Sequence, residues 1–242
     1  MGSFLIVGGS SDIGLELCQR LVEDNHKVTT VARDQSRLKD FNDDSIVKIF
    51  GDAISDEVIK EAVILATEAG QGKLDGVAHL VGSLALRPPH AMTIESFEEV
   101  IKTNLTSAFI TLSIACKQML RNGGGRVIFT SSVAGSLGLV NHEAISAAKG
   151  GVESMVRSAA ATYARRGIRV NAVAPGLTDT RLSIPITKSE NSRQAAVDRI
   201  PINRINEAEE IVRTINWLLT DAPDNITGQV LHLDGGMSKV RN

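Results

Sequence analysis

The chain has 242 residues, with 26 basic and 28 acidic side chains, 43% hydrophobic residues and 3% aromatic residues. This near-neutral balance argues against a partner bound through charge, so we expect neither nucleic acid nor a membrane surface. The two cysteines, Cys18 and Cys116, stand far apart with no CxxC pair or Cys/His cluster, so neither a disulfide framework nor a metal site is predicted. The chain opens on a predicted strand and has no apolar run of membrane-spanning length, so we expect a cytoplasmic protein.

Apolar runs typical of buried strands alternate with helical patterns along the whole chain. In chain order these are strand Phe4–Val7, helix Ile13–Val22, strands Val28–Ala32 and Val47–Phe50, helix Val58–Ala69, strand Gly76–Val81, helix Phe97–Leu120, strand Arg126–Thr130, helix Ala144–Ala164, strand Arg169–Val173, helix Ala208–Leu219 and strand Val230–Leu233. The alternation predicts an α/β fold in a single domain over 1–242, with one doubly wound parallel sheet of about seven strands and helices on both faces. Residues 177–206 are less regular, and we predict a substrate lid there.

A glycine-rich segment follows the first predicted strand and opens the first helix: Gly8-Gly9-Ser10-Ser11-Asp12-Ile13-Gly14. In a Rossmann fold this turn points backbone N–H groups at the pyrophosphate of a dinucleotide. The alternative is a glycine-rich turn without a ligand. The predicted cofactor-binding residues of this loop are Gly8, Ser10, Ser11, Asp12, Ile13 and Gly14. A carboxylate beside a pyrophosphate is repulsive, so we expect Asp12 to point away and cap the first helix.

The end of the second strand indicates which dinucleotide binds. An NAD-binding domain places an acid there for the ribose 2′-hydroxyl, but this chain has Ala32 followed by Arg33. An arginine at this place can pair with a 2′-phosphate. We therefore predict NADP(H) as the preferred cofactor, with NAD(H) possible. The alternative is that Arg33 is a solvated surface residue beside Asp34.

Several further segments, taken together with the glycine loop, make the chain resemble the short-chain dehydrogenase/reductases over nearly its whole length. The matching residues are Asp52, Asn104 in Thr103-Asn104-Leu105, Ser132 in Ser131-Ser132-Val133-Ala134-Gly135, Lys149, the segment Pro175-Gly176-Leu177-Thr178-Asp179-Thr180, and the ending Ile226-Thr227-Gly228 … Asp234-Gly235-Gly236. Ala53, Val81 and Gly82 are further predicted cofactor-binding residues. The resemblance implies that Asp52 contacts adenine and that the segment with Pro175, Gly176, Thr178 and Thr180 holds the nicotinamide carboxamide.

The resemblance also implies catalytic roles. Ser132 would hydrogen-bond the substrate carbonyl, Lys149 would bind the nicotinamide ribose and lower the pKa of a tyrosine, and Asn104 would hold a water in a proton relay. The family's tyrosine gives its proton to the alkoxide as hydride arrives, which is general acid catalysis. The hydride chemistry belongs to the cofactor.

The proton donor's place departs from the family pattern. The Tyr-x-x-x-Lys motif falls on Ile145-Ser146-Ala147-Ala148-Lys149, which puts isoleucine where the tyrosine belongs. Tyr163, the chain's single tyrosine, lies about 27 Å further along a helix at 1.5 Å per residue and cannot substitute. A second departure is His79-Leu80-Val81-Gly82, where the family has Asn-Asn-Ala-Gly.

Three interpretations stay open. The protein is a reductase with another donor, such as His142, Ser146 or a water held by Asn104 and Lys149. It acts on a substrate that needs no tyrosine, such as an activated C=C bond or an iminium-like group. Or it binds NADP(H) without turnover, as a sensor or partner subunit. A hydrolase is not predicted, because no nucleophile elbow is present.

The predicted helix Ala144–Ala164 carries many small residues, which allow a second helix to approach closely. In the resembling family this helix contributes to a dimer interface, so we predict a homo-oligomer, either a tetramer or a dimer, with the tetramer favoured. The alternative is that these residues pack only on the chain's own sheet. The substrate is expected to be a small molecule whose identity the lid sets.

Overall fold

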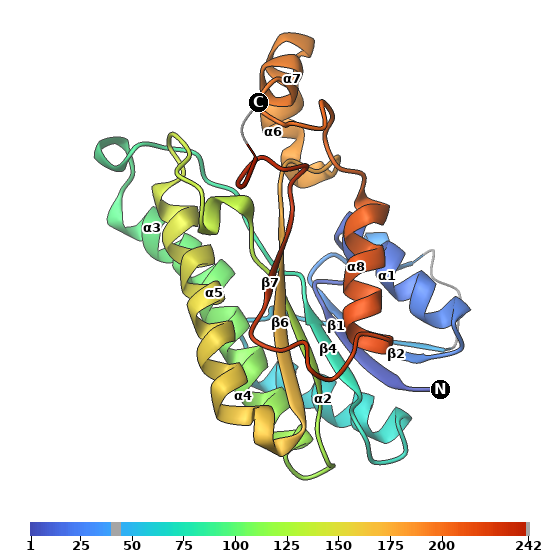
Figure 1. Ribbon diagram of the computed structural model, residues 1–242. Helices are drawn as coiled ribbons and strands as arrows, with labels where there is room; N and C mark the ends of the chain where they lie inside the picture. The colour runs from blue at the N-terminus through green and yellow to red at the C-terminus, as the bar shows by residue number, and fades with distance from the viewer. Residues whose placement is uncertain (40–44, 241–242) are drawn as a thin grey trace.

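The computed structural model describes residues 1–39 and 45–240. Seven parallel strands form one sheet in the order β3-β2-β1-β4-β5-β6-β7 (Figure 1). This confirms the predicted doubly wound α/β fold. The order reverses between β1 and β4, and ligands of such sheets bind at that switch point, outside the carboxyl ends of the strands.

The strands fall where the apolar runs predict them, with ends that move by a few residues. They are β1 (Ser3–Val7), β2 (Lys27–Ala32), β3 (Ile46–Phe50), β4 (Gly76–His79), β5 (Gly125–Thr130), β6 (Ile168–Pro175) and β7 (Val230–Leu233). The predicted strand Gly76–Val81 is shortened to β4, because Leu80 and Val81 already belong to the loop that lines a cavity.

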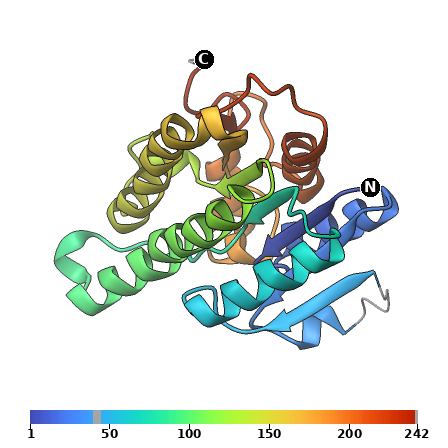
Figure 2. The same cartoon turned by 90° about the horizontal axis from the view of Figure 1, so that it is seen from below.

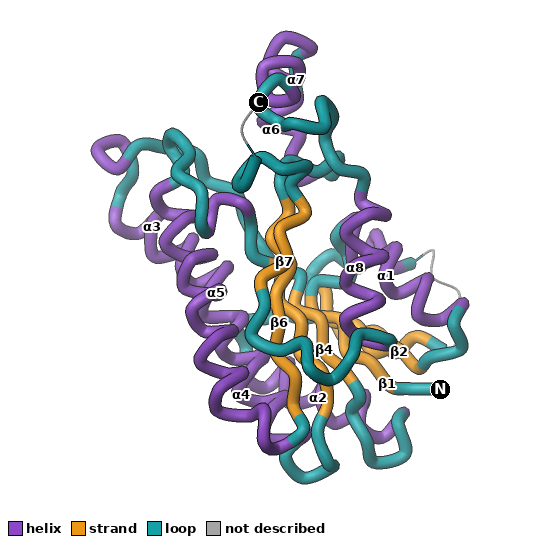
Figure 3. Tube along the Cα trace, viewed as in Figure 1, coloured by secondary structure: helices purple, strands orange, loops and turns teal. Residues whose placement is uncertain are grey.

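Helices cover both faces of the sheet, as Figure 2 and the tube of Figure 3 show. The long helices are α1 (Asp12–Glu23), α2 (Asp56–Ala69), α3 (Ile94–Ile101), α4 (Ser107–Met119), α5 (Glu143–Tyr163) and α8 (Ala208–Thr220). Short 3-10 turns are η1 (Ser36–Leu38), η2 (Pro89–Ala91), η4 (Val133–Gly135), η5 (Ala164–Arg166) and η6 (Arg181–Ser183).

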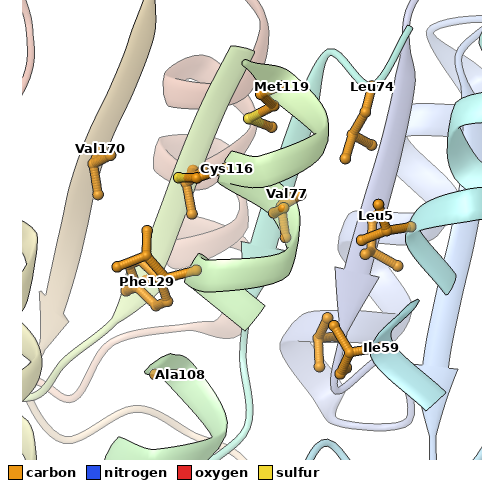
Figure 4. Close-up of a cluster of buried hydrophobic side chains, with 14 of the residues drawn as sticks. Leu5, Ile59, Leu74, Val77, Ala108, Cys116, Met119, Phe129 and Val170 are labelled. Atoms are coloured by element: carbon orange, nitrogen blue, oxygen red, sulfur yellow. The ribbon is translucent and has the colours of Figure 1, made fainter. Parts of the chain in front are cut away.

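Alternate residues of each strand face opposite layers of the core. On β1, Leu5 and Val7 pack toward α2, α4 and α5, in the cluster that Figure 4 shows around Val77 and Phe129. Phe4 and Ile6 pack on the other face against α1 and α8. Cys18 and Cys116 are buried free thiols, one in each layer, so both serve as small core residues.

The predicted helix Phe97–Leu120 is interrupted by a π-helical segment, η3 (Lys102–Thr106), between α3 and α4. Asn104 sits in this segment, and its side-chain Nδ2 donates to the carbonyl of Val100, 2.9 Å away. A side chain that takes the carbonyl four residues earlier competes with the backbone for that acceptor and loosens the helix. The Ser107 hydroxyl donates to the Thr103 carbonyl in the same way, so two side-chain bonds accompany the interruption around Asn104.

The segment predicted as a lid contains η6 and two further short helices, α6 (Ile184–Thr187) and α7 (Glu190–Val197). They stand above the carboxyl ends of the strands, at the top of Figure 1. Leu182 and Ile184 at its front are about half exposed, whereas Ile200 and Ile205 near its end are buried, so its front is less firmly packed than its end.

Candidate active site

A cavity of about 680 Å³ opens at the carboxyl ends of the strands. Loops that follow β1, β2, β3, β4, β5 and β6 all line it, which places it at the switch point of the sheet. The predicted site residues that line it are Gly8, Ser10, Ser11, Asp12, Ile13, Arg33, Asp52, Ala53, Val81, Gly82, Asn104, Ser132, Lys149, Pro175, Gly176, Thr178 and Thr180. Residues from across the whole chain thus meet in one place.

Gly14 is the predicted site residue that does not line the cavity. A Cβ atom built on it would lie 2.5 Å from the carbonyl oxygen of Gly8, which itself has a positive φ of 99°. Gly14 is needed for the close approach of helix α1 to the turn. Gly14 therefore shapes the loop, and a cofactor contact at Gly14 stays a prediction.

The cap of helix α1 is Ser11, whose Oγ accepts from the backbone N–H of Gly14 at 3.0 Å. Asp12 is the first helical residue, so the prediction that Asp12 caps the helix is wrong. Its carboxylate points instead to Arg37 and to the backbone N–H of Arg181. The first backbone N–H groups of an α-helix have no intrahelical carbonyl partner and can bind anions. In α1 these include the N–H groups of Asp12 and Ile13.

Two arginines lie at the outer end of the cavity, beyond β2. The side chain of Arg33 is 69% exposed, and its Nη1 lies 3.6 Å from a carboxylate oxygen of Asp52. Arg37, which stands in no sequence motif, is held more tightly: it pairs with Asp12 at 2.6 Å and donates to the carbonyl of Ser10. An exposed pair such as Arg33 with Asp52 contributes little to stability, so Arg33 is free to bind an anion.

Lys149 lies on α5 with its Nζ at the inner end of the cavity. The Nζ donates to the carbonyl of Thr130 at 2.7 Å, and burial lowers the pKa of this amine to about 8. One of the three ammonium protons is thus used, which leaves donors for a ligand in the cavity.

Ser132 follows β5 and caps η4. Its Oγ accepts from the backbone N–H of Ala134 at 3.2 Å, so its own hydroxyl proton is free for a group in the cavity. Asn104 is fully buried and bonds to Ser83: Nδ2 donates to the hydroxyl of Ser83 at 2.9 Å, and Oδ1 accepts from its backbone N–H at 3.1 Å. With its second Nδ2 proton on Val100, the Asn104 side chain can hold a water only as an acceptor.

Ile145 lines the cavity and is 3% exposed. It packs in a small apolar cluster with Val100, Ala134, Ala144 and Ala148. The structure therefore accommodates an aliphatic side chain at this place, and no proton can come from it.

Of the alternative donors, His142 lines the cavity, whereas Ser146 and Tyr163 are absent from its lining. The Nδ1 of His142 lies 2.7 Å from the carbonyl of Val140, an acceptor, so Nδ1 carries the hydrogen. The Nε2 is left as the acceptor of the neutral ring. Ser146 follows Ile145 on helix α5 and does not line the cavity, so the geometry favours His142 over Ser146 as the candidate donor.

His79, in the place of the family's first asparagine, ends β4 inside the core. Its Nε2 lies 3.1 Å from the hydroxyl of Ser107, and its Nδ1 lies 3.0 Å from that of Thr111. The Ser107 hydroxyl already donates to the Thr103 carbonyl, so it accepts from Nε2–H, while Thr111 donates to Nδ1. Burial, and secondarily the charge of Lys149, lower the pKa of His79 to about 3. This neutral ring ties β4 to helix α4, which directly follows the segment η3 that carries Asn104.

Several lining residues carried no motif and were missed. The lining also includes Arg37, Ser83, Leu84, Leu139, Arg181, Leu182 and Ile186. Position offered the only signal: Ser83 and Leu84 follow a strand end, and Arg37 comes four residues after Arg33. Among the described residues, no cluster of histidine, cysteine or acidic side chains could hold a metal ion. Within the same residues, no helix is long and apolar enough to cross a membrane.

Comparison with known proteins identifies the family. A family model described as enoyl-(acyl carrier protein) reductase matches residues 8–238. The solved structure of a short-chain type dehydrogenase/reductase from Mycobacterium ulcerans superposes with a TM-score of 0.91 at 29% identity, covering 99% of this chain and 90% of that one. This chain belongs to the short-chain dehydrogenase/reductase family.

Curated relatives of this short-chain dehydrogenase/reductase span its length. The 3-oxoacyl-[acyl-carrier-protein] reductase MabA of Mycobacterium tuberculosis is 34% identical over 97% of this chain and 92% of its own length. Levodione reductase of Leifsonia aquatica is 33% identical over 97% of this chain and 93% of its own. A structure of a variant of actinorhodin polyketide ketoreductase with NADPH has a TM-score of 0.91 at 25% identity, covering 99% of this chain and 98% of that one.

Proposed function

We propose that this protein is an NADP(H)-dependent oxidoreductase that transfers hydride to or from a small carbonyl or alcohol, or an activated double bond. The observation that carries the proposal is that Ser132 and Lys149 line the same cavity as the glycine loop. A hydrogen-bond donor for a substrate oxygen and a cation for a ribose thus stand beside a pyrophosphate-binding turn.

The residues present fit a nicotinamide dinucleotide. The cavity runs from Arg33 and Asp52, past the start of α1, to Lys149, and its volume lies within the usual range of about 300–1,000 Å³ for cofactor sites. A Cβ atom on Gly82 would lie 3.2 Å from Asn104 Oδ1, so the glycine keeps the wall beside Lys149 open. When bound, the cofactor supplies the hydride.

NADP(H) is favoured over NAD(H) because Arg33 stands beyond Ala32, where an NAD-binding domain would carry an acid. The related actinorhodin polyketide ketoreductase is solved with NADPH, which supports the same choice. Arg37 adds a second cation at this end of the cavity, and NAD(H) remains the weaker alternative.

In this mechanism the free hydroxyl of Ser132 donates a hydrogen bond to the substrate oxygen and so stabilises the negative charge that develops there. Lys149 holds the ribose with its remaining ammonium protons. Asn104 places Ser83, whose hydroxyl accepts from the Asn104 amide and keeps its own proton for the cavity. The Ser83 hydroxyl can therefore hold a water in the cavity that Lys149 also lines.

The proton donor is atypical, because Ile145 has none to give. We assign this role to His142, which lines the cavity three residues before Ile145. With Nδ1–H fixed on the Val140 carbonyl, Nε2 of the protonated ring is the nitrogen that can deliver a proton. A substrate with an activated double bond would need this donor less.

The substrate side of the cavity is apolar, with Leu84, Leu139, Leu182 and Ile186 along it. Residues 177–206 supply two of these and are proposed as the substrate lid. The relatives named for 3-oxoacyl and levodione reduction support an oxo compound with an apolar body as the substrate class.

A second candidate function is binding of NADP(H) without turnover. Ile145 favours it, because this side chain is embedded in an apolar cluster rather than replaced by another acid. Lys149 would then serve ribose binding alone.

We further propose a homotetramer, in which small exposed residues of α5 such as Ala147 and Ala161, and the exposed Phe109 on α4, face a second copy. A monomeric mass by light scattering would contradict this assembly.

The proposed function is tested by two measurements on the purified protein. Fluorescence titration with NADPH is expected to saturate, and no saturable signal would overturn the proposal. A screen of oxo compounds and enones with NADPH is expected to give turnover that Ser132→Ala reduces. NADPH binding without any turnover would favour the binding-only function.

A further inference from the structure

Asp12 joins two segments that lie far apart in the sequence. One oxygen of its carboxylate accepts from Arg37 at 2.6 Å, and the other accepts from the backbone N–H of Arg181 at 2.7 Å. The second contact spans 169 residues and crosses the cavity mouth, since Asp12, Arg37 and Arg181 all line it. The glycine loop is thereby bonded directly to the first residue of η6.

Arg37 fixes the direction of the carboxylate. Its guanidinium donates to the Ser10 carbonyl as well as to Asp12, so it is bound at two points of the glycine loop. Its side chain is 21% exposed and that of Asp12 is 26% exposed, which makes this a partly buried, charge-assisted pair. Burial alone would raise the pKa of Asp12, but the hydrogen bonds from Arg181 and Arg37, together with their charges, hold it below its usual value.

The other fixed points of the segment that begins at Arg181 lie within it or toward its carboxyl end, where Ile200 is buried and the Ile202 N–H donates to the Gly235 carbonyl. Thr180 and Ser183 bond to one another in a capping box, and α6 and α7 pack on each other. The contact between Thr178 and Asn206 closes the base of the segment. The hydrogen bond from Arg181 to Asp12 is the link between the front of this segment and the glycine loop.

We propose that Asp12 is a positioning residue that holds the front of the lid, residues 177–206, against the glycine loop, with Arg37 orienting its carboxylate. The inference rests on the proposed function and deepens it by assigning what keeps the substrate side of the cavity closed. A glycine at this place would have no side chain that could do so.

Limited trypsin digestion tests the tie without cofactor or substrate, because Arg181, Lys188, Arg193 and Arg199 place cleavage sites along the lid. Proteolysis follows the population of the open form. Asp12→Ala is expected to raise cleavage in the lid about tenfold, the usual effect of losing one charge-assisted hydrogen bond. Asp12→Asn keeps an oxygen that can accept from Arg181 and is expected to raise cleavage less.

Asp56→Ala is the matched control. Asp56 is also the first residue of its helix, follows a capping serine, and pairs with an exposed Lys60 outside the cavity. It reproduces the loss of an acid at a helix N-terminus and is expected to leave lid cleavage as in the wild type. The double variant Asp12→Ala/Arg37→Ala is expected to be cut no faster than Asp12→Ala alone, because Arg37 acts through Asp12.

Lid cleavage at the wild-type rate in Asp12→Ala, with peptides identified by mass spectrometry, would overturn the inference. Equal acceleration in Asp56→Ala would do so as well. If Asp12→Ala does not fold, Asp12→Asn and Arg37→Ala give the same comparison. Because the digestion needs no cofactor, it can succeed or fail separately from the NADPH titration that tests the proposed function. With turnover established, Asp12→Ala is expected to raise the substrate KM more than it lowers kcat.

Discussion

Ile145 lies one turn before Lys149 on helix α5, and both side chains line the same cavity. The pair separates two tasks that a Tyr-x-x-x-Lys motif combines. Lys149 keeps a buried amine with protons available for a ribose, whereas Ile145 offers only apolar surface. Binding and proton transfer can therefore be tested independently in this protein.

Ile145→Tyr places a phenol where the resemblance expects the proton donor. We expect the rate of carbonyl reduction with NADPH to rise by about 10²–10⁴-fold, the usual contribution of a positioned general acid. Ile145→Phe is the control, since it adds the ring without the hydroxyl. Turnover in Ile145→Tyr together with none in the wild type would favour the binding-only function. An equal gain in Ile145→Phe would show that packing, not the proton, is responsible.

His142→Gln tests the assigned donor. Glutamine can keep a hydrogen bond to the Val140 carbonyl but cannot deliver a proton at the place of Nε2. We expect kcat for oxo substrates to fall by about 10²-fold or more with little change in NADPH affinity. His90→Gln, a histidine outside the cavity lining, is the control. Wild-type kcat in His142→Gln would exclude His142 and favour a water held near Ser83.

The sequence was sufficient to predict the sheet, because each strand is a short run rich in apolar and β-branched residues and the turns carry glycine, proline or polar residues. Through the resemblance to the family, the sequence was also sufficient to predict that Ser132, Asn104 and Lys149 belong to one site. It could not predict that Ser11 rather than Asp12 caps α1, since that choice depends on the arginine contacts that draw the Asp12 carboxylate away. The break in the helix at Asn104 was missed for a similar reason, because apolar spacing does not register a side chain that takes a backbone carbonyl.

Arg33→Ala tests the cofactor preference. We expect NADPH affinity to fall about 10- to 100-fold, the usual value of hydrogen bonds to a charged phosphate, while NADH affinity stays nearly constant. Fluorescence titration with both cofactors measures the ratio. Arg121→Ala removes an arginine at a turn outside the cavity and serves as the control. An unchanged ratio in Arg33→Ala would assign the discrimination elsewhere.

Because of Lys149, we expect the free energy of unfolding to depend on pH in the alkaline range. Burial lowers its pKa from 10.5 to about 8, so between these values the unfolded chain holds a proton that the folded chain has lost. The contribution of Lys149 to the free energy of unfolding therefore rises with pH across this window, and it is constant below the lower and above the upper value. Relative to Lys149→Met, the wild type is expected to gain about 2 kcal/mol between pH ~8 and ~10, measured by urea unfolding. A pH-independent difference would mean that the amine is solvated.

Because of His79, we expect the free energy of unfolding to fall at acid pH. Its pKa is lowered from 6.5 to about 3 by burial and by Lys149, so below about pH 6.5 the unfolded chain takes up a proton that the folded chain refuses. The stability contributed by the neutral ring is complete above this value and is lost as the pH falls toward 3, at roughly 1.4 kcal/mol for each pH unit.

His79→Asn is expected to be less stable than the wild type at neutral pH, because the bonds to Ser107 and Thr111 are disturbed. The deficit should shrink as the pH falls through the window, since asparagine does not titrate. Urea unfolding of both proteins measures this, with His90→Asn as an exposed control. A deficit that stays constant from neutral to acid pH would mean that His79 takes up a proton as readily in the folded protein as in the unfolded chain.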